Sequence, residues 1–315
     1  MAKTALVAPL ECKRHDPGPG HPEQPARVDA VRNALRQEGL MEKLLLLPSR
    51  TASNDELRLV HTTAYIELAR YEIFSGARDL STGDTAVCRD SFDAALIAAG
   101  SVLRAVDAVF TDEAQNAFCC VRPPGHHATP DRGMGFCLFN NVAIGARYAQ
   151  RKYGCERVAI VDWDVHHGNG TQETFWSDGT VLFFSTHQYP WYPGTGAAHE
   201  MGEGKGKGLI LNCPFPAGAG FTEIGGAFRD RLLPALHKFR PELILISAGF
   251  DCRRGDPLGR FTLSDEDFAE LTRLMTEAAH RHANGRLVSV LEGGYNLEGL
   301  GKAVAAHVRA LTESD

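Results

Sequence analysis

The chain has 315 residues, of which 43% are hydrophobic and 23% are charged. This composition is that of an ordinary globular protein, and it excludes a disordered, collagen-like or coiled-coil chain. With 33 basic and 39 acidic residues the net charge is -6, so the chain lacks the electropositive footprint of a nucleic-acid-binding protein. We therefore expect no nucleic-acid partner.

The cysteine and apolar patterns indicate the compartment. The 8 cysteines form no CxxC pair, and neither a secretion signal nor an apolar stretch of about 18 residues is found. We therefore expect reduced thiols, a cytoplasmic location and no membrane association. The 13 histidines are the unusual feature of the composition.

Short apolar runs without alternation are typical of strands that are buried on both faces. In chain order they cover residues 5–7, 44–47, 117–121, 158–161, 181–184, 209–211, 243–246 and 287–291. Amphipathic segments with helical period lie between several of them, at residues 25–38, 91–110, 140–153, 222–239, 264–281 and 297–311. This alternation predicts an α/β fold, a parallel sheet with helices on both faces. Because no linker or repeat interrupts the chain, we expect residues 1–315 to form one domain.

Polar residues follow the predicted strands at the edge where ligands bind in open parallel sheets. After residues 158–161 the chain continues as DWDVHHGNG, and a strand period of two places Asp162, Asp164 and His166 on one face. The strand at residues 243–246 leads to Asp251. Each residue alone would be more typical of a solvated cap. Two carboxylates and an imidazole from two strand ends, however, leave a fourth position open, as a catalytic zinc site requires.

Two further strand ends carry candidate catalytic groups. The strand at residues 117–121 leads into a Pro-Pro-Gly turn and the adjacent His126 and His127. A stiff turn suits proton transfer, although a surface histidine pair would be unremarkable. The last strand leads to Tyr295, whose hydroxyl can face a developing oxyanion, while a packed aromatic ring is the alternative.

Four motifs carry a family resemblance: RPPGHHA at 122–128, DWDVHHGNGTQ at 162–172, SAGFD at 247–251 and EGGY at 292–295. They resemble the zinc-dependent histone deacetylase and acetylpolyamine amidohydrolase family. Asn169 and the HPEQPAR segment at 21–27 resemble its class II and bacterial members. The resemblance implies the arginase-deacetylase fold, a single α/β domain with a parallel sheet of about eight strands.

The resemblance also implies the roles of the reacting groups. Asp164, His166 and Asp251 would bind one zinc ion per chain, which polarises the acyl carbonyl and activates a water. Tyr295 would hydrogen-bond the oxyanion that forms from the carbonyl.

The two adjacent histidines receive separate roles from the resemblance. His127 would act as general base and then as general acid. His126, oriented by Asp162, would give electrostatic support. In many class I relatives the histidine that corresponds to His127 has an Asp as its partner, so Asn169 implies a different bias on the pKa of His127. Which of the two histidines is charged at neutral pH is left open.

Further residues match the family's substrate tunnel, each with a plain structural role as its alternative. Phe136, after Gly135, resembles one wall, and Tyr189, Trp191 or Tyr192 would supply the other, with Tyr192 our choice. The remaining assignments are Asp84 at the rim, Leu258 and Gly294 along the substrate, and Arg27 near the product exit. The family also binds a monovalent cation such as K⁺ through backbone atoms near Asp162, Asp164, His166 and Ser185.

The leading hypothesis is zinc-dependent hydrolysis of an N-acetyl or other N-acyl amide. The substrate would be acetyl-lysine in a peptide or protein, or an acetylated polyamine or other small amine. One alternative is a dimanganese ureohydrolase of the arginase type, which the DxDxH pattern disfavours. Another is a catalytically silent acyl-lysine binding protein. A homo-oligomer is compatible with either enzyme.

Overall fold

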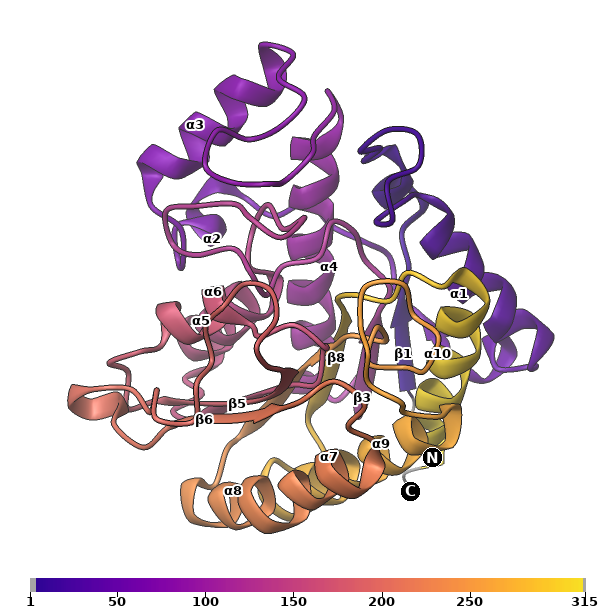
Figure 1. Ribbon diagram of the computed structural model, residues 1–315, viewed down its shortest axis with the longest axis vertical. Coiled ribbons are helices and arrows are strands. Elements are labelled where there is room, and N and C mark those ends of the chain that lie inside the picture. The colour runs from indigo at the N-terminus through magenta and orange to yellow at the C-terminus, as the bar shows by residue number, and fades with distance from the viewer. Residues whose placement is uncertain (1–3, 314–315) are drawn as a thin grey trace.

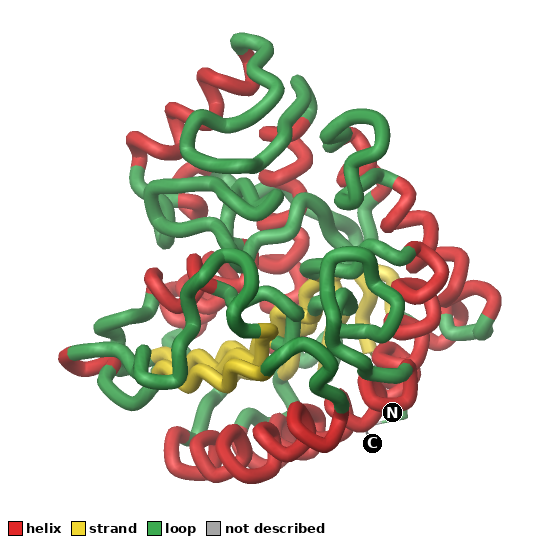
Figure 2. The backbone as a smooth tube through the Cα atoms, in the orientation of Figure 1, coloured by secondary structure: helices red, strands yellow, loops and turns green. Residues whose placement is uncertain are grey.

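A computed structural model describes residues 4–313, and a parallel sheet lies at its centre (Figures 1 and 2). The strands of this 8-stranded sheet follow the order β2-β1-β3-β8-β7-β4-β5-β6. Every neighbouring pair is parallel. The predicted fold class is therefore confirmed over the described residues.

The strands are buried on both faces. Within β4, Val158 and Ile160 enter one apolar core, while Ala159 and Val161 enter the other. This alternation of faces explains why the strands appear in the sequence as unbroken apolar runs. The strand bounds are β1 (Thr4–Val7), β2 (Leu45–Leu46), β3 (Asn116–Cys119), β4 (Val158–Asp162), β5 (Val181–Gln188), β6 (Ile210–Phe215), β7 (Leu243–Ala248) and β8 (Leu287–Leu291).

Helices cover both faces of the sheet (Figure 1). One core takes side chains from α3, α4 and α5, and the other takes them from α1, α7, α8, α9 and α10. The helix bounds are α1 (Ala26–Gln37), α2 (Asn54–Leu57), α3 (Thr63–Phe74), α4 (Ser91–Phe110), α5 (Asn141–Tyr153), α6 (Asn169–Thr174), α7 (Phe221–Ala227), α8 (Leu233–Phe239), α9 (Asp265–His282) and α10 (Leu297–Thr312).

The helices differ from the sequence-based expectation in two ways. The single helix expected at residues 222–239 is divided into α7 and α8 by the π-helical turn Phe228–Leu232, and Pro234, which has no N–H to donate, lies in the first turn of α8. Helices α2, α3 and α6 were not predicted. The longest of these is α3. Its outer face carries Leu68, Tyr71 and Phe74, which are exposed, so its apolar residues do not define one face.

The sheet brings the four motifs together. Strands β3, β8, β7 and β4 are consecutive in the sheet, and one motif lies at the carboxyl end of each of them. Because the strands are parallel, these carboxyl ends meet at one edge. In residues 4–313 no helix is both long enough and apolar enough to cross a membrane.

Candidate metal centre and active site

Successive turns after β4 carry the first two metal candidates. The strand ends at Asp162, so the expected period-two alternation does not continue through Asp164 and His166. Instead, the backbone N–H of Asp164 donates to Asp162 Oδ1 over 3.0 Å, and that of His166 donates to Asp164 Oδ1 over 2.9 Å. These side-chain-to-backbone turns bend the chain, as short Asp side chains commonly do.

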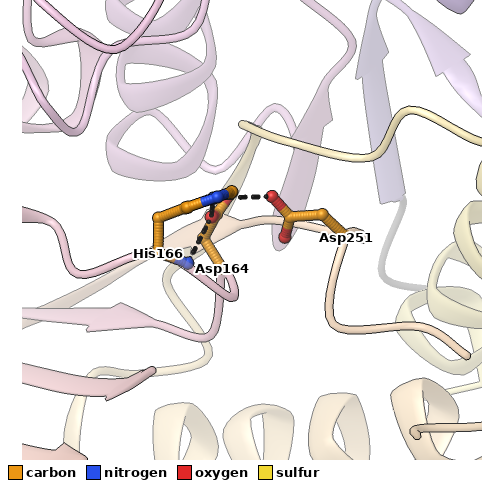
Figure 3. Close-up of side chains that lie close together, drawn as sticks. All are labelled: Asp164, His166 and Asp251. Atoms are coloured by element: carbon orange, nitrogen blue, oxygen red, sulfur yellow. Dashed lines mark hydrogen bonds and ion pairs between the residues drawn. The ribbon is translucent and has the colours of Figure 1, made fainter. Parts of the chain in front are cut away.

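Asp164, His166 and Asp251 form a buried cluster whose ligand atoms all lie within 4.8 Å of one another. His166 Nδ1 lies 3.0 Å from Asp164 Oδ1 and 3.1 Å from Asp251 Oδ2. Figure 3 shows Asp251 reaching this point from a different chain segment than the other two. Ligands about 2.0–2.1 Å from a tetrahedral zinc ion are separated by roughly 3.3 Å, so the set fits this metal.

The rest of each carboxylate is held by the backbone. Gly293 N–H donates to Asp164 Oδ2 over 2.8 Å, and Val165 N–H donates to Asp251 Oδ1 over 2.9 Å. A Cβ on Gly293 would lie 2.1 Å from Asp251 Oδ2, and one on Gly249 would lie 2.2 Å from Asp164 Oδ2. The glycines of the SAGFD and EGGY motifs therefore leave the space that the carboxylates occupy.

The adjacent histidines have acceptor partners of different charge. His126 Nδ1 donates to Asp162 Oδ2 over 2.9 Å, and His127 Nδ1 donates to Asn169 Oδ1 over 2.7 Å. Burial alone would lower the pKa of His126, but the carboxylates of Asp162 and Asp164 raise it to about 10. Burial and the neighbouring positive charge of His126 hold the pKa of His127 well below its usual range. At neutral pH, His127 is therefore the neutral imidazole, with the lone pair of Nε2 available.

Tyr295 is buried beside Arg27. Its ring lies 5.1 Å from the Arg27 guanidinium, and its backbone N–H donates to Asp256 Oδ2 over 2.7 Å. Burial and the nearby carboxylate of Asp251 raise the pKa of the Tyr295 hydroxyl well above its usual range. The hydroxyl therefore stays protonated and can donate a hydrogen bond.

A cavity of about 260 Å³ joins these groups to the surface. Asp84 is exposed and marks its mouth, while His127, His166 and Tyr295 are buried and mark its inner end. The cavity is lined by Asp84, His127, Gly135, Phe136, His166, Trp191, Tyr192, Pro257, Leu258 and Tyr295. Five of the six predicted substrate-contact residues are among these.

The other tunnel assignments have different outcomes. Trp191 and Tyr192 both line the cavity, and Tyr189 is not among its lining residues. Gly294 is not among them either: its carbonyl accepts a hydrogen bond from Arg27 Nε over 2.7 Å. Arg27 lies behind Tyr295, fully buried.

The mouth of the cavity is fixed by Asp84. Its Oδ1 accepts from the backbone N–H of Gly135 over 2.7 Å and from the Tyr192 hydroxyl over 3.1 Å. The Tyr192 ring lies 5.2 Å from the ring of His127. Tyr192 therefore links the mouth of the cavity to its inner end.

Three buried carboxylates support the site without having been predicted. Asp256 accepts from Tyr295 N–H and, over 2.9 Å, from Leu258 N–H. Glu23 accepts from Arg27 and Arg122. Glu292 accepts from backbone N–H groups of the histidine turn, the segment of residues 122–128 that carries the two adjacent histidines. Glu23 and Glu292 lie inside the recognised motifs, and that position was the only signal in the sequence.

Comparison with known proteins agrees with this geometry. The family model described as "Histone deacetylase domain" matches residues 21–311. A "Probable deacetylase" of Archaeoglobus fulgidus is 43% identical over 94% of this chain and 82% of its own length. A "Histone deacetylase-like amidohydrolase" of Pseudomonas aeruginosa is 42% identical over 88% of this chain and 73% of its own length.

Further relatives extend the comparison. Human "Polyamine deacetylase HDAC10" is 43% identical over 92% of this chain, which spans 44% of that protein. The solved structure "Crystal Structure of HDA15 HD domain" has a TM-score of 0.94 at 35% identity and covers 100% of this chain and 90% of its own. These matches show that the chain belongs to the histone deacetylase family of enzymes, as its four motifs predicted.

Proposed function

We propose that the protein is a zinc-dependent amidohydrolase that releases acetate and a free amine from an N-acetylated alkylamine. The observation that carries this proposal is the convergence on one cavity of an open three-residue metal site, a neutral histidine and a tyrosine hydroxyl. The relatives named as deacetylases and as an amidohydrolase support the same reaction class.

Asp164, His166 and Asp251 are the residues that would hold the zinc. A zinc ion bound there supplies Lewis-acid polarisation of the acyl carbonyl and lowers the pKa of a water. The two carboxylates bring two negative charges to this position, and the backbone donors that hold their other oxygens keep them oriented toward His166.

His127 transfers the proton. Its Nδ1–H is fixed on Asn169, so Nε2 accepts a proton from the attacking water and later gives it to the departing amine nitrogen. The positive charge of His126 lies beside it, with the two ring centroids 4.0 Å apart, and this charge favours release of the proton to the amine. Asp162 holds His126 in that charged form.

Tyr295 stabilises the oxyanion. Its neutral hydroxyl lies at the inner end of the cavity and donates to the acyl oxygen as negative charge develops there. Arg27 lies behind the Tyr295 ring, and we propose that it borders the route by which acetate leaves.

The cavity walls indicate an alkyl stem. Apolar side chains and rings from Phe136, Trp191, Pro257 and Leu258 line it, while Asp84 is the acidic residue at its mouth. An acetyl-lysine side chain and an acetylated small amine both fit these walls.

We also propose a monovalent cation near the backbone of Asp162. Within residues 4–313, the potential metal-binding cluster contains three residues, so nothing favours a dimanganese ureohydrolase.

Metal analysis combined with substrate comparison tests the proposal. We expect about one zinc per chain, and hydrolysis of acetyl-lysine peptides or of acetylputrescine and acetylspermidine. The ratio of kcat/KM between these two groups identifies the natural class. Removal of the metal by a chelator should abolish turnover, and added zinc should restore it. A zinc-loaded protein that hydrolyses neither group would contradict the proposal, as would two manganese ions per chain.

A further inference from the structure

Glu292 is a buried carboxylate that the proposed mechanism does not use. It directly follows β8, and its side chain is fully buried. Its Oε2 accepts from the backbone N–H of Gly125 over 2.7 Å and from that of His126 over 3.2 Å. Its Oε1 accepts from the Ser247 hydroxyl over 3.1 Å. Every polar atom of this carboxylate therefore has a partner, and two of those partners belong to the histidine turn.

Other segments hold the carbonyl groups of the turn: Pro123 O accepts from Asn141 Nδ2, and His126 O accepts from the N–H groups of Gly170 and Thr171. Glu292 holds its N–H groups. Pro123 and Pro124 have no N–H, so the N–H groups of Gly125 and His126 are the first donors that the turn offers after Arg122. Both point to the same oxygen of Glu292. A buried N–H without a partner is costly, so this oxygen fixes the path of the backbone on which the two histidines stand.

The backbone of Glu292 and Gly293 also contacts the rest of the site. The backbone N–H of Glu292 donates to Ala248 O over 3.0 Å, and its carbonyl accepts from Arg27. The next residue, Gly293, donates its N–H to Asp164 Oδ2. A displacement of Glu292 would therefore shift the histidine turn, a metal-binding carboxylate and the chain leading to Tyr295.

We propose that Glu292 is a positioning residue that sets the distance of His126 and His127 from the metal cluster through its two backbone hydrogen bonds. This inference depends on the proposed function, because its kinetic consequence is a change in proton transfer by His127. Moving a catalytic group by about 1 Å can reduce a rate by about 100-fold. The length of the Glu292 side chain therefore determines its effect on the rate.

Charge is the alternative contribution of this carboxyl group. Burial raises the pKa of Glu292 to about 7, although the positive charge of His126 and the Gly125 N–H act in the opposite direction. A protonated carboxyl would keep both backbone bonds and could donate its proton to the Ser247 hydroxyl. The two contributions can therefore be separated by substitutions that keep one and remove the other.

Glu292→Gln and Glu292→Asp form the matched pair. Gln keeps the reach: its carbonyl oxygen can accept both N–H groups and its amide can donate to Ser247, while the charge is lost. Asp keeps the charge but is one methylene shorter. We expect kcat to fall less than about fivefold in Glu292→Gln and at least about 30-fold in Glu292→Asp. KM and zinc content should stay within about twofold in both variants.

Ser247→Ala is the control, because it removes the third partner of the carboxylate and leaves both bonds to the turn. We expect its kcat to stay within about twofold of the wild-type value. A Glu292→Asp variant with the wild-type kcat would overturn the positioning role. So would a Glu292→Gln variant whose kcat is as low as that of Glu292→Asp. A fall in kcat that tracks loss of zinc in both variants would overturn it too.

Hydrogen exchange provides a measurement that does not depend on activity. In the wild-type protein we expect the amides of Gly125 and His126 to exchange slowly. In Glu292→Asp we expect these two amides to exchange faster, while the exchange of the β8 amides stays unchanged. Unprotected exchange at these two amides in the wild-type protein would overturn the inference even if Glu292→Asp does not fold. Slow exchange in a protein that hydrolyses no acetylated amine would instead reject the proposed function.

Discussion

At the scale of single residues, the Tyr295 hydroxyl is a donor that can be removed without changing the shape of the cavity. We expect Tyr295→Phe to reduce kcat by about 100- to 1,000-fold, because a donor to a developing oxyanion contributes roughly 3–4 kcal/mol. KM and zinc content should change little, since the ring contacts with Phe136 and Arg27 remain. Steady-state kinetics and metal analysis on the same preparation check this, and an unchanged kcat would remove Tyr295 from the mechanism.

The Tyr192 hydroxyl acts at the mouth of the cavity. Tyr192→Phe removes the hydrogen bond to Asp84 Oδ1 but keeps the ring beside His127. A hydrogen bond of about 1 kcal/mol corresponds to roughly fivefold in binding. We therefore expect KM for an acetyl-lysine peptide to rise about two- to fivefold, with kcat within about twofold. Asp84→Asn serves for comparison, and a change in kcat alone would show that Tyr192 acts on the reaction step.

The sequence predicted which residues form the candidate metal cluster and the histidine pair, because these groups follow strand ends within short motifs. It did not identify the supports of these groups. Glu292 acts on Gly125, 167 positions away, and Glu23 acts on Arg122, 99 positions away. Such contacts depend on how distant segments pack, and local spacing does not encode them.

At the scale of elements, helix α9 offers a test of stability separate from activity. Ser264 caps its first turn: the Ser264 side chain accepts from Asp267 N–H, and Asp267 Oδ2 accepts from Ser264 N–H over 2.8 Å. Ser264→Ala should lower the free energy of unfolding by about 1 kcal/mol and leave kcat and KM unchanged, because α9 packs on the sheet away from the cavity. Urea denaturation measures the loss, and a variant of wild-type stability would contradict the contribution of the cap.

Capped, amphipathic helices were predictable and the irregular segments were not. The predicted segment at residues 264–281 corresponds to α9, Asp265–His282, because the Ser264 cap and the apolar period agree. The π-helical turn Phe228–Leu232 could not be predicted from the spacing of apolar residues, because it changes the backbone hydrogen bonding while the buried face continues. Strand β2 is shorter than predicted because it lies at the sheet edge, where Leu46 is exposed.

At the scale of the whole molecule, buried neutral histidines make the fold sensitive to acid. His61 donates through Nδ1 to Thr129 O over 3.0 Å and accepts through Nε2 from Asn140 N–H over 2.9 Å, an arrangement that requires the neutral ring. Burial lowers the pKa of His61 to about 4. The unfolded chain, with a pKa of about 6.5, therefore binds a proton that the folded protein does not bind between these values.

Stability should consequently fall as the pH is lowered from about 6.5 toward 4. At pH 5 the contribution of His61 to this loss is about 2 kcal/mol. We expect the unfolding free energy of His61→Gln to depend less steeply on pH than that of the wild-type protein, by about this amount between pH 7 and pH 5. His187 and His307, whose pKa values burial lowers to about 4 and about 3, are present in both proteins and cancel in the comparison. Equal slopes for the two proteins would contradict the prediction.

The sheet class could be predicted, but the strand order could not. Apolar runs and helix alternation indicate a parallel sheet, yet nothing local places β8, the last strand, between β3 and β7. That placement puts the EGGY segment between the histidine turn and Asp251. The site therefore depends on the global order of strands, whereas the sequence predicts convergence of the motifs only from their chemistry.

The hydrogen bond from the Thr4 hydroxyl to the carbonyl of Leu311, 3.1 Å long, has a practical consequence. Thr4 begins β1 and Leu311 lies near the end of α10, so this bond joins these two elements at the amino edge of the sheet, opposite the edge that bears the cavity. A surface tether attached beside the start of β1 or the end of α10 would therefore hold the cavity mouth facing away from the support. Immobilised through that edge, the protein would keep its opening accessible even to a large acetylated protein.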